Sequence, residues 1–473
     1  MKYSIRSTIF ILLFLCKLNS NAQCIGWTNM QSTDSVFTNP AFGIATTVEA
    51  DRLHRPISYV SIVSGGIKIY DNNASGNPAV IASITKSQLG NLDAINLTQD
   101  SIWLYVCLGN IWDTTELAGL AIVDVSNFNS PVVLDIYIHP GLKGGAGAVE
   151  IEGNHAFLAA NQNGLIILDI SNKSDIQFTS SLLLNNNFPH STGVDALKYN
   201  ARGIAIKGNH AYVCYDRGGL RVIDISNLNS LQQISQYCTP DLINFATAYN
   251  NIVINDNIAF VAIDYYGLEI LDISDPANIV QISRWQPSTW PAATNDPFLW
   301  AGSPGHCNEL AYDSLCKIVY VASGKSDVVA IDVSTPAFPI TCQMYGSSSD
   351  DYGTWGLDYF DNSIHLAYIW SPLAPPYSNY TGYKVIQTTC STTAVSEHTS
   401  NPQISLVATS ANGNYRVETK DQLLQTIEVF NMNGRLLQKH FMNEFSIELL
   451  ANGLYFIRIL TNNSSIVRKI VKQ

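Results

Sequence analysis

The sequence predicts an all-β protein: a seven-bladed β-propeller of four-stranded blades, followed by a small C-terminal β-sandwich. Three observations predict this fold. A glycine-led apolar strand that ends in aspartate recurs about every 50 residues. Three further short, strand-like segments accompany each copy. Between residues 40 and 390, no long segment repeats its apolar residues at the helical period of about 3.6.

The recurring strand is the strongest evidence for a repeat. It reads GLAIVDVSN at 119–127, GLIILDISN at 164–172, GLRVIDISN at 219–227 and GLEILDISD at 267–275, with looser copies at 66–72, 327–335 and 382–388. The aspartates are Asp71, Asp124, Asp169, Asp224, Asp272 and Asp332, and Gln387 holds the seventh position. Successive positions differ by 53, 45, 55, 48, 60 and 55 residues. Seven four-stranded units at this spacing predict seven blades.

The third copy shows how one unit is built. Segments 148–154, 155–161, 164–172 and 176–184 read as four short strands joined by tight connections. Because propeller blades pack face to face, the third strand is apolar on both sides. Its aspartate stands where the strand becomes a turn, so its carboxylate can accept backbone N–H groups of that turn. We interpret the six aspartates as structural, because one enzyme does not need six copies of a catalytic acid.

These copies resemble the LVIVD repeat, a motif of bacterial and archaeal surface or secreted proteins, over residues 40–390. The resemblance rests on the glycine, the apolar run, the aspartate and the serine recurring together. It implies a propeller and no particular activity, because the biochemical role of the family is largely unassigned. The first and last copies depart from the pattern: Asn73 replaces the serine, and Gln387 replaces the aspartate.

The last blade lacks one strand within its own repeat. Segments 356–361, 363–370 and 382–389 supply three strands, and nothing strand-like follows them before the linker. Residues 23–39 belong to no repeat, so we expect this N-terminal segment to supply the fourth strand and close the ring. Cys24 and Cys390 would then flank the same blade, and we expect a disulfide between them.

The two ends of the chain carry export signals. Residues 1–22 combine the basic Lys2 and Arg6, a short apolar core and small residues before the expected cleavage point, which predicts a secretory signal peptide. After a linker at 391–400, residues 401–473 contain IEVFNMNGRLL, NGLYFIRI and a basic KIVK. This segment resembles the C-terminal sorting domain of type IX secretion cargo in Bacteroidetes. The resemblance implies a β-sandwich, the type IX secretion machinery as partner, and a secreted or outer-surface protein that passes through the periplasm.

Composition excludes several classes of protein. The net charge of −12 becomes about −15 once the three basic residues of the signal peptide are removed, which argues against a nucleic-acid partner. Beyond the signal peptide no stretch approaches 18 apolar residues, so the mature chain is not expected to be transmembrane. Neither zinc-type cysteine spacing nor a nucleotide, lipase or zincin motif occurs, so we expect no metal, no cofactor and no catalytic residue.

Loops at one end of the expected channel are rich in aromatic and charged residues. Propellers bind ligands where the strand-connecting loops surround the channel mouth, and convergent aromatic and polar side chains suit a glycan or peptide. The eight candidate ligand-binding residues are Trp300, His306, Trp355, Asp264, Tyr266, Arg217, His190 and Trp370. The first five are expected around one common depression. The alternative is that these rings only pack the loops against the blades.

Three function classes therefore stay open. The first is a secreted or cell-surface module for binding or adhesion, which recognises a glycan, a peptide or a partner protein. The second is an extracellular propeller enzyme that acts on polysaccharide, as a lyase or a glycosidase. The third is a passive envelope component. The sequence favours binding, because the aromatic loops are present and no catalytic motif is.

Overall fold

The structure is a computed structural model. Within 24–390 it describes all residues except 25–26, 28–29, 39–43, 74–77, 111–116, 193–194, 246, 265, 287–306, 324–326, 348–351 and 372–377. Within 404–472 it describes all residues except 409–412, 420–422, 432–435, 452 and 463–464. The expected signal peptide (1–22) and linker (391–400) lie outside the described residues. The chain forms two compact units, Met1–Cys390 and Ser391–Gln473.

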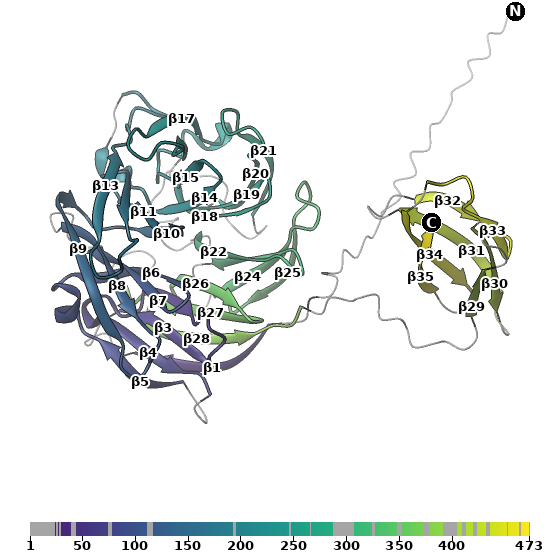
Figure 1. Ribbon diagram of the computed structural model, residues 1–473, viewed down its shortest axis with the longest axis horizontal. Coiled ribbons are helices and arrows are strands. Elements are labelled where there is room, and N and C mark those ends of the chain that lie inside the picture. The colour runs from purple at the N-terminus through teal and green to yellow at the C-terminus, as the bar shows by residue number, and fades with distance from the viewer. Residues whose placement is uncertain are drawn as a thin grey trace, which may run out of the picture. The chain divides into compact units, whose positions relative to one another are not determined.

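Within its described residues, the first unit consists of seven four-stranded antiparallel sheets, which surround a centre as blades (Figure 1). Blade one contains β2 (Thr47–Ala50), β3 (Ile57–Ser61), β4 (Ile67–Asp71) and β5 (Ala79–Ile84). Blade two contains β6 (Asp93–Asp100), β7 (Trp103–Gly109), β8 (Leu117–Asp124) and β9 (Val132–Lys143). Blade three contains β10 (Ala148–Glu152), β11 (His155–Ala159), β12 (Leu165–Asp169) and β13 (Gln177–Leu182).

The remaining blades follow the same order, with the first strand innermost. Blade four contains β14 (Gly203–Lys207), β15 (His210–Cys214), β16 (Leu220–Asp224) and β17 (Gln232–Tyr237). Blade five contains β18 (Ala248–Asn255), β19 (Ile258–Asp264), β20 (Gly267–Asp272) and β21 (Val280–Trp285). Blade six contains β22 (Cys307–Asp313), β23 (Ile318–Ser323), β24 (Val328–Asp332) and β25 (Ile340–Tyr345). Short 3₁₀ turns lie at η2 (Val63–Gly65), η3 (Lys86–Leu89), η4 (Ala196–Lys198) and η5 (Pro240–Leu242).

Blade seven is completed by the N-terminal segment. Its sheet order is β1 (Gln31–Phe37), β28 (Gly382–Gln387), β27 (Ser363–Tyr368) and β26 (Thr354–Phe360). The strand β1 pairs antiparallel with β28 from Gln31 opposite Gln387 to Phe37 opposite Gly382. The outermost strand of this blade therefore comes from the start of the described chain, and its backbone hydrogen bonds close the ring.

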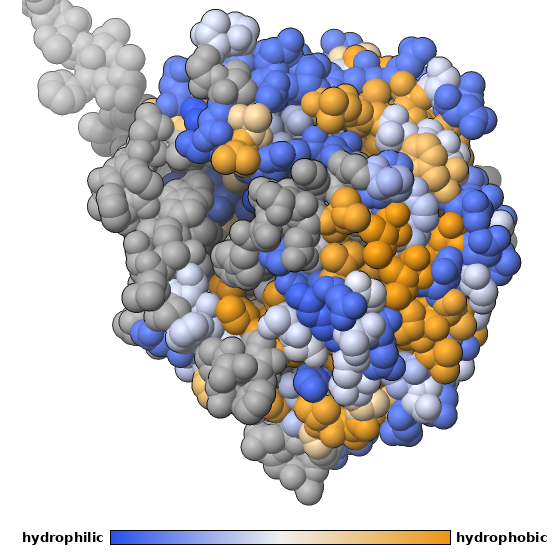
Figure 2. Space-filling model, turned by 90° about the vertical axis from the view of Figure 1, so that its left-hand side faces the viewer, coloured by the Kyte–Doolittle hydropathy of each residue, from blue (hydrophilic) through white to orange (hydrophobic). Residues whose placement is uncertain are grey.

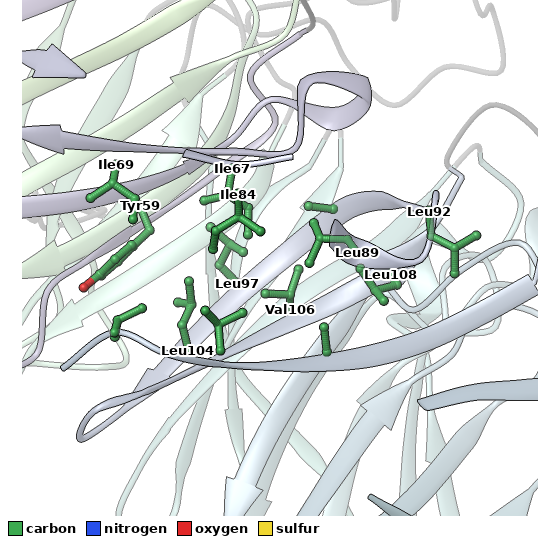
Figure 3. Packing of buried hydrophobic residues seen from close by; sticks show 14 of the residues in the cluster. Tyr59, Ile67, Ile69, Ile84, Leu89, Leu92, Leu97, Leu104, Val106 and Leu108 are labelled. Atoms are coloured by element: carbon green, nitrogen blue, oxygen red, sulfur yellow. The ribbon is translucent and has the colours of Figure 1, made fainter. Parts of the chain in front are cut away.

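The core of the propeller lies between neighbouring blades. Figure 3 shows one such layer, in which Tyr59 and Ile69 of blade one pack with Leu104 and Val106 of blade two. The four apolar residues of β12, from Leu165 to Leu168, are at most 1% exposed. This burial explains the continuous apolar run of β12, because a sheet covered on both faces has no solvent side.

The recurring aspartates close the turns after these strands. In five blades the Oδ1 atom accepts the backbone N–H of the serine two residues later at 2.8 Å, and in blade one Asp71 accepts that of Asn73 at 2.9 Å. These side chains are half-buried, because the strand ends where they stand. The backbone hydrogen bond holds the pKa of Asp169, Asp224 and Asp272 below its ordinary value.

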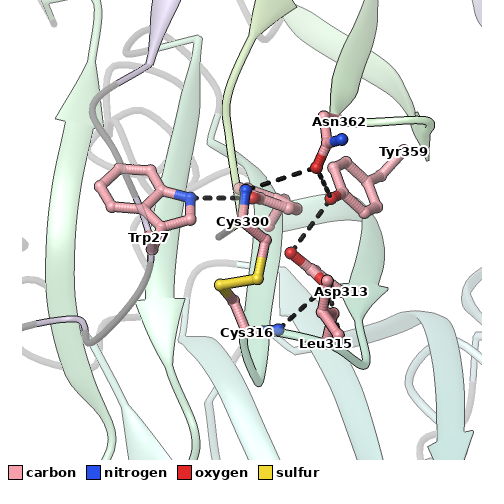
Figure 4. The surroundings of a disulfide bond; sticks show 8 residues. Trp27, Asp313, Leu315, Cys316, Tyr359, Asn362 and Cys390 are labelled. Carbon is pink, nitrogen blue, oxygen red and sulfur yellow. Dashed lines mark hydrogen bonds between the residues drawn. A yellow bond between two sulfur atoms is a disulfide. The ribbon is translucent and has the colours of Figure 1, made fainter. Parts of the chain in front are cut away.

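The expected Cys24–Cys390 disulfide is wrong. Cys24 bonds to Cys342 with Cα atoms 5.8 Å apart, and Cys390 bonds to Cys316 with Cα atoms 5.6 Å apart. Trp27, and not Cys24, stands opposite Cys390 in a β-bridge. Both cysteines therefore bond to blade six and not to each other. Figure 4 shows the Cys316–Cys390 bond beside the turn that follows β22.

The second unit contains two sheets. One consists of β29 (Ile404–Ala408), β30 (Asn414–Thr419) and β33 (Glu444–Ser446). The other consists of β32 (Leu436–His440), β31 (Leu424–Asn431), β34 (Gly453–Thr461) and β35 (Ser465–Lys472). Val417 and Phe445 of the first sheet share one buried apolar cluster with Ile427 and Ile457 of the second. The unit is therefore a small β-sandwich.

The rim of the propeller is partly apolar. The side that carries β9 and β13 shows orange patches between polar areas (Figure 2). Among the apolar residues of these two outer strands, Val132 is 53% exposed and Phe178 is 45% exposed. The side chains of the outer strand β13 are mostly exposed or half-buried, whereas those of β11 in the same blade are mostly buried.

Candidate binding site in the central channel

The inner strands of all seven blades line one cavity of about 230 Å³. Its walls are Thr46, Ile95, Asn96, Gly147, Arg202, Asn250, Asn251, Asn308, Glu309 and Trp355. Each residue lies at or just before the N-terminal end of an inner strand, and each blade contributes at least one. The cavity is therefore the upper part of the central channel, where the inner strands begin.

Irregularities in four inner strands turn side chains into this cavity. Ile95, Asn250 and Trp355 are each skipped in the pairing between the first two strands of their blade. The same pairing in blade six is irregular between Cys307 and Leu310, where Asn308 and Glu309 stand. A β-bulge re-aims the residue that it leaves unpaired, and bulges are frequent beside functional sites.

Two glycines let the inner strands approach each other around the channel. A Cβ atom at Gly356 would lie 2.6 Å from the Cα atom of Thr47, and one at Gly203 would lie 2.6 Å from the carbonyl oxygen of Asn250. Any larger residue would push neighbouring strands apart. The narrow channel therefore depends on glycine at these positions.

The polar wall of the cavity is organised around one glutamate and several amides. Asn96 Nδ2 donates to Glu309 Oε1 at 3.0 Å, and the Leu357 N–H donates to Glu309 Oε2 at 2.8 Å. Burial raises the pKa of Glu309 to about 8, and the charge of Asp358 adds to that shift. The Glu309 carboxyl group therefore keeps its proton at neutral pH.

The amide of Asn308 is incompletely used. Asn250 Nδ2 donates to the Cys307 carbonyl oxygen at 2.9 Å and to Asn308 Oδ1 at 3.3 Å. The buried Asn308 Nδ2 finds no hydrogen-bond partner among the described residues. A buried donor without an acceptor costs about 1–3 kcal/mol, so a ligand that supplied an acceptor would gain from this site.

An ion pair stands beside Arg202 where the channel opens. Arg202 Nη2 lies 3.6 Å from Asp216 Oδ2, which also accepts a hydrogen bond from Asn200 Nδ2 at 2.9 Å. Burial raises the pKa of Asp216, while Arg202 opposes the shift and Asp264 adds to it. Asp216 also forms a β-bridge with Tyr249 of blade five, so this carboxylate lies at a joint between two blades.

A second group of charges joins blades one and seven further along the channel. Arg52 Nη2 lies 3.0 Å from Glu49 Oε1 and 2.8 Å from Asp358 Oδ1. Asp358 Oδ2 accepts the Ala50 N–H at 2.8 Å. Burial raises the pKa of Glu49 to about 8, and Asp358 raises it further while Arg52 lowers it. These carboxyl groups are already engaged by the protein, which assigns them to the joint between the blades.

The structure places the predicted site residues in different surroundings. Trp355 lines the channel cavity, and Asp264 lies close enough to Asp216 to raise its pKa. Tyr266 is 2% exposed and belongs to the apolar core between blades four and five. Trp300 and His306 lie outside the described residues, so their place in the depression stays a prediction.

The other three candidates lie away from the cavity walls. The His190 Nε2 atom is 2.7 Å from the Ile243 carbonyl oxygen. The backbone N–H of Arg217 donates to the Lys198 carbonyl oxygen at 3.1 Å. Trp370 is half-buried after β27. Of the six described candidates, only Trp355 belongs to the cavity.

Sequence analysis missed most of the channel residues. The residues at the starts of the inner strands are Asn96, Arg202, Asn250, Asn308 and Glu309, whereas the sequence-based candidates lie mostly in the loops between strands. Aligning the repeats on the inner strands would have found them, because these positions vary between copies while the apolar positions beside them do not.

Two family models match the chain. The LVIVD repeat matches residues 115–138, 143–183, 200–239, 249–286 and 317–346. The secretion system C-terminal sorting domain matches residues 401–473. The chain is therefore a β-propeller built from LVIVD repeats that ends in a sorting domain of type IX secretion cargo from Bacteroidetes. The five repeat matches fall on blades two to six.

The sorting domain indicates export by the type IX secretion machinery to the cell surface or the extracellular space. Among the described residues, no helix has the length and apolar character needed to cross a membrane. The search of curated proteins found no match.

Solved structures that match part of this chain include the computationally designed Ika8 protein and a β-propeller domain. Ika8 is 13% identical over 76% of this chain and 99% of that chain, with a TM-score of 0.44. The Cps50 (Swd1) β-propeller domain of Myceliophteria thermophila is 10% identical over 76% of this chain and 100% of that chain, with a TM-score of 0.49. Neither likeness bears on function at these values.

Proposed function

We propose that this exported protein is a binding module whose central channel takes up a small polar ligand, with a sugar residue of a glycan as the first candidate. One observation carries the proposal: all seven blades bring a residue to the same cavity, and one of these, Asn308, has a buried amide nitrogen that meets no acceptor among the described residues. Amides, a guanidinium and a tryptophan ring together offer the donors, acceptors and apolar face that a sugar ring uses.

A glycan array probed with the full chain tests this proposal. Asn250→Ala and Asn308→Ala together remove two of the four asparagine side chains in the cavity wall, so the double variant should bind the best glycan at least about tenfold more weakly in calorimetry. Asn229→Ala, at an exposed turn, is the matched control and should bind like the original chain. A double variant that binds with unchanged affinity would place the ligand elsewhere.

One observation favours an enzyme as the second candidate. A carboxyl group that keeps its proton at neutral pH can serve as a general acid, and Glu309 has a pKa of about 8. A glycosidase also needs a second carboxylate, and Asp358 is already held by Arg52 and the Ala50 N–H. Incubation with polysaccharides decides the matter: new reducing ends that disappear with Glu309→Gln would support an enzyme.

A chain that neither binds glycans or peptides nor cleaves polysaccharide would fit a passive envelope component.

A further inference from the structure

A second cavity, of about 360 Å³, lies between blades one and seven. We name it the joint pocket. The turns that follow β2, β4 and β26 form its walls, together with residues from β27 and β28. Strands alternate in direction within each blade, so these turns lie at the ends of the inner strands that are opposite to the channel cavity. The joint pocket is therefore a separate site.

Three departures from the repeat pattern meet in this pocket. Asn73 and Gln387 stand where other copies have serine and aspartate, and both line the pocket. The third departure is His365. Each recurring aspartate pairs with a residue on the second strand of its blade. Two positions after that partner, blades one to six have an aromatic residue: Tyr59, Tyr105, Phe157, Tyr212, Phe260 and Tyr320. In blade seven, Gln387 pairs with Ser363, and the residue two positions after Ser363 is His365.

The convergence is not required by the fold. Six blades use an aromatic ring and an aspartate at the two positions where blade seven has His365 and Gln387, so the propeller geometry is compatible with the ordinary residues. Blade one and blade seven also lie outside the segments that match the repeat family. The three departures bring two amide groups and one imidazole to the walls of a single cavity, and such neutral donors and acceptors are what a binding site for a polar ligand requires.

His365 belongs to a closed network of uncharged groups. Its Nδ1 atom lies 3.0 Å from Ser58 Oγ and 2.9 Å from the Tyr383 hydroxyl group. Asn72 Nδ2 donates to Ser58 Oγ at 2.9 Å, and the Tyr383 hydroxyl donates to Asn72 Oδ1 at 3.0 Å. Burial lowers the pKa of His365 to about 4, so this imidazole is neutral at physiological pH.

The charged residues of the joint pocket are already paired. Arg55 donates to both carboxylate oxygens of Asp51 and to the carbonyl oxygens of Val125 and Ser126. His54 contacts the Asp361 carboxylate. An ionic ligand would therefore lose its hydration without meeting an unpaired opposite charge.

The groups left for a ligand are neutral. The side chain of Asn73 makes no hydrogen bond to the described part of the chain, and Gln387 uses one amide hydrogen on Ser363 Oγ at 2.9 Å. Ile57 and Val385 add apolar surface to the same walls. Amide groups beside apolar side chains match a molecule that carries hydroxyl groups on a hydrocarbon ring.

We propose that the joint pocket binds a neutral, hydroxyl-rich ligand of the size of one sugar residue. This site is independent of the channel site proposed above. A ligand bound there contacts blade one and blade seven at once, so it also stabilises the interface between the first and the last blade. Binding to the folded state alone raises the unfolding temperature of the full chain.

The test uses methyl glycosides of glucose, galactose, mannose and N-acetylglucosamine as probes, with the full chain and saturation-transfer NMR followed by calorimetry. Asn73→Ser with Gln387→Asp restores the repeat pattern at both positions and is the joint variant. Asn250→Ala with Asn308→Ala is the channel variant. At least one glycoside should bind the original chain and should bind the joint variant at least tenfold more weakly. The same glycoside should bind the joint pocket of the channel variant as tightly as that of the original chain.

A photoreactive diazirine glycoside locates the site directly and does not depend on a variant that folds. Labelling of peptides that contain 50–57, 71–73 or 360–365 supports the proposal. It is overturned if no glycoside binds at millimolar concentration, if the joint variant is folded and binds as the original chain does, or if the label is found only on channel residues. The second and third results would leave the channel site standing, and the channel variant then tests it, so failure of the two proposals can be told apart.

Discussion

Asn96 of blade two donates a 3.0 Å hydrogen bond to Glu309 of blade six, although these blades are not neighbours in the ring. The other oxygen of Glu309 accepts the Leu357 N–H of blade seven at 2.8 Å. One carboxyl group thus connects three blades through the channel. Because burial raises its pKa to about 8, the folded protein holds a proton that the unfolded chain has released.

Glu309→Gln should reduce the pH dependence of stability. The unfolded carboxyl group titrates near 4.5 and the folded one near 8, so the folded state binds more protons between these values. The free energy of unfolding therefore falls as pH rises from about 5 to 8. Glutamine does not titrate. The Glu309 side chain is half-buried, so solvent screening weakens the effect, and we expect the loss between pH 5 and pH 9 to shrink by roughly 1 kcal/mol.

Urea unfolding at pH 5, 7 and 9 measures this change. Asp256→Asn, at an exposed turn between β18 and β19, is the control and should keep the original pH dependence. Glu49 shifts in the same direction as Glu309, so some pH dependence should persist in the variant. An unchanged slope in Glu309→Gln would mean that Glu309 titrates normally.

Asp169→Ala should lower the free energy of unfolding by about 1 kcal/mol, because the Ser171 N–H loses its acceptor. Asp169→Asn keeps an oxygen at the same place and should cost less. The depressed pKa of Asp169 means that its contribution is present above the unfolded value and is lost as pH falls through the folded value. Chemical unfolding at pH 7 and pH 3 checks both points, and equal costs for the two variants would contradict the turn assignment.

Peptide mapping without reduction should recover Cys24 with Cys342 and Cys316 with Cys390. The bonds span 318 and 74 residues, for which the chain-entropy model gives about 4–6 kcal/mol each as an upper value. Cys24→Ser with Cys342→Ser should therefore lower the unfolding temperature and speed proteolysis within residues 24–38. A Cys24 peptide linked to any cysteine but Cys342 would contradict the structure.

Deletion of residues 401–473 should leave a folded propeller that stays in the periplasm of a bacterium with a type IX system. The two compact units divide after Cys390, so the propeller core does not depend on the tail. Fractionation and thermal unfolding of the truncated chain measure the two expectations. Asn229→Ala with an intact tail is the control and should leave the cell normally. Normal release of the truncated chain would show that the tail is dispensable for export.

The repeat made the architecture readable from sequence. Each third strand must be apolar on both faces, and each must end in a turn, so the same pattern appears in every copy. Asp169 and Asp224 could be assigned to turns for that reason. The strand supplied by residues 31–37 was inferred from the missing strand of blade seven, because an unpaired edge is unfavourable.

The disulfide partners and the channel residues depend on details that a repeat pattern does not contain. Cys24 bonds to Cys342, while Trp27 is the residue that pairs with Cys390. Which residue pairs with Cys390 depends on the local register of the segment before β1, and the repeat pattern does not specify that register. Asn250 and Trp355 enter the channel because their strands bulge there. A bulge moves one residue without changing the apolar pattern around it, so periodicity alone does not reveal it.

The pairing of β1 with β28 fixes the order in which the molecule can be completed. Gln31 is among the first residues of the propeller to be synthesised, and its partner Gln387 follows 356 positions later (387 minus 31). Contacts this distant in sequence form late, because much chain entropy must be lost before they form. The ring therefore cannot close until nearly the whole propeller has been translated and exported. Since the sorting domain follows β28, any chain that carries this domain also contains every strand needed for closure, and a chain that terminates before β28 has neither the last strands nor the domain.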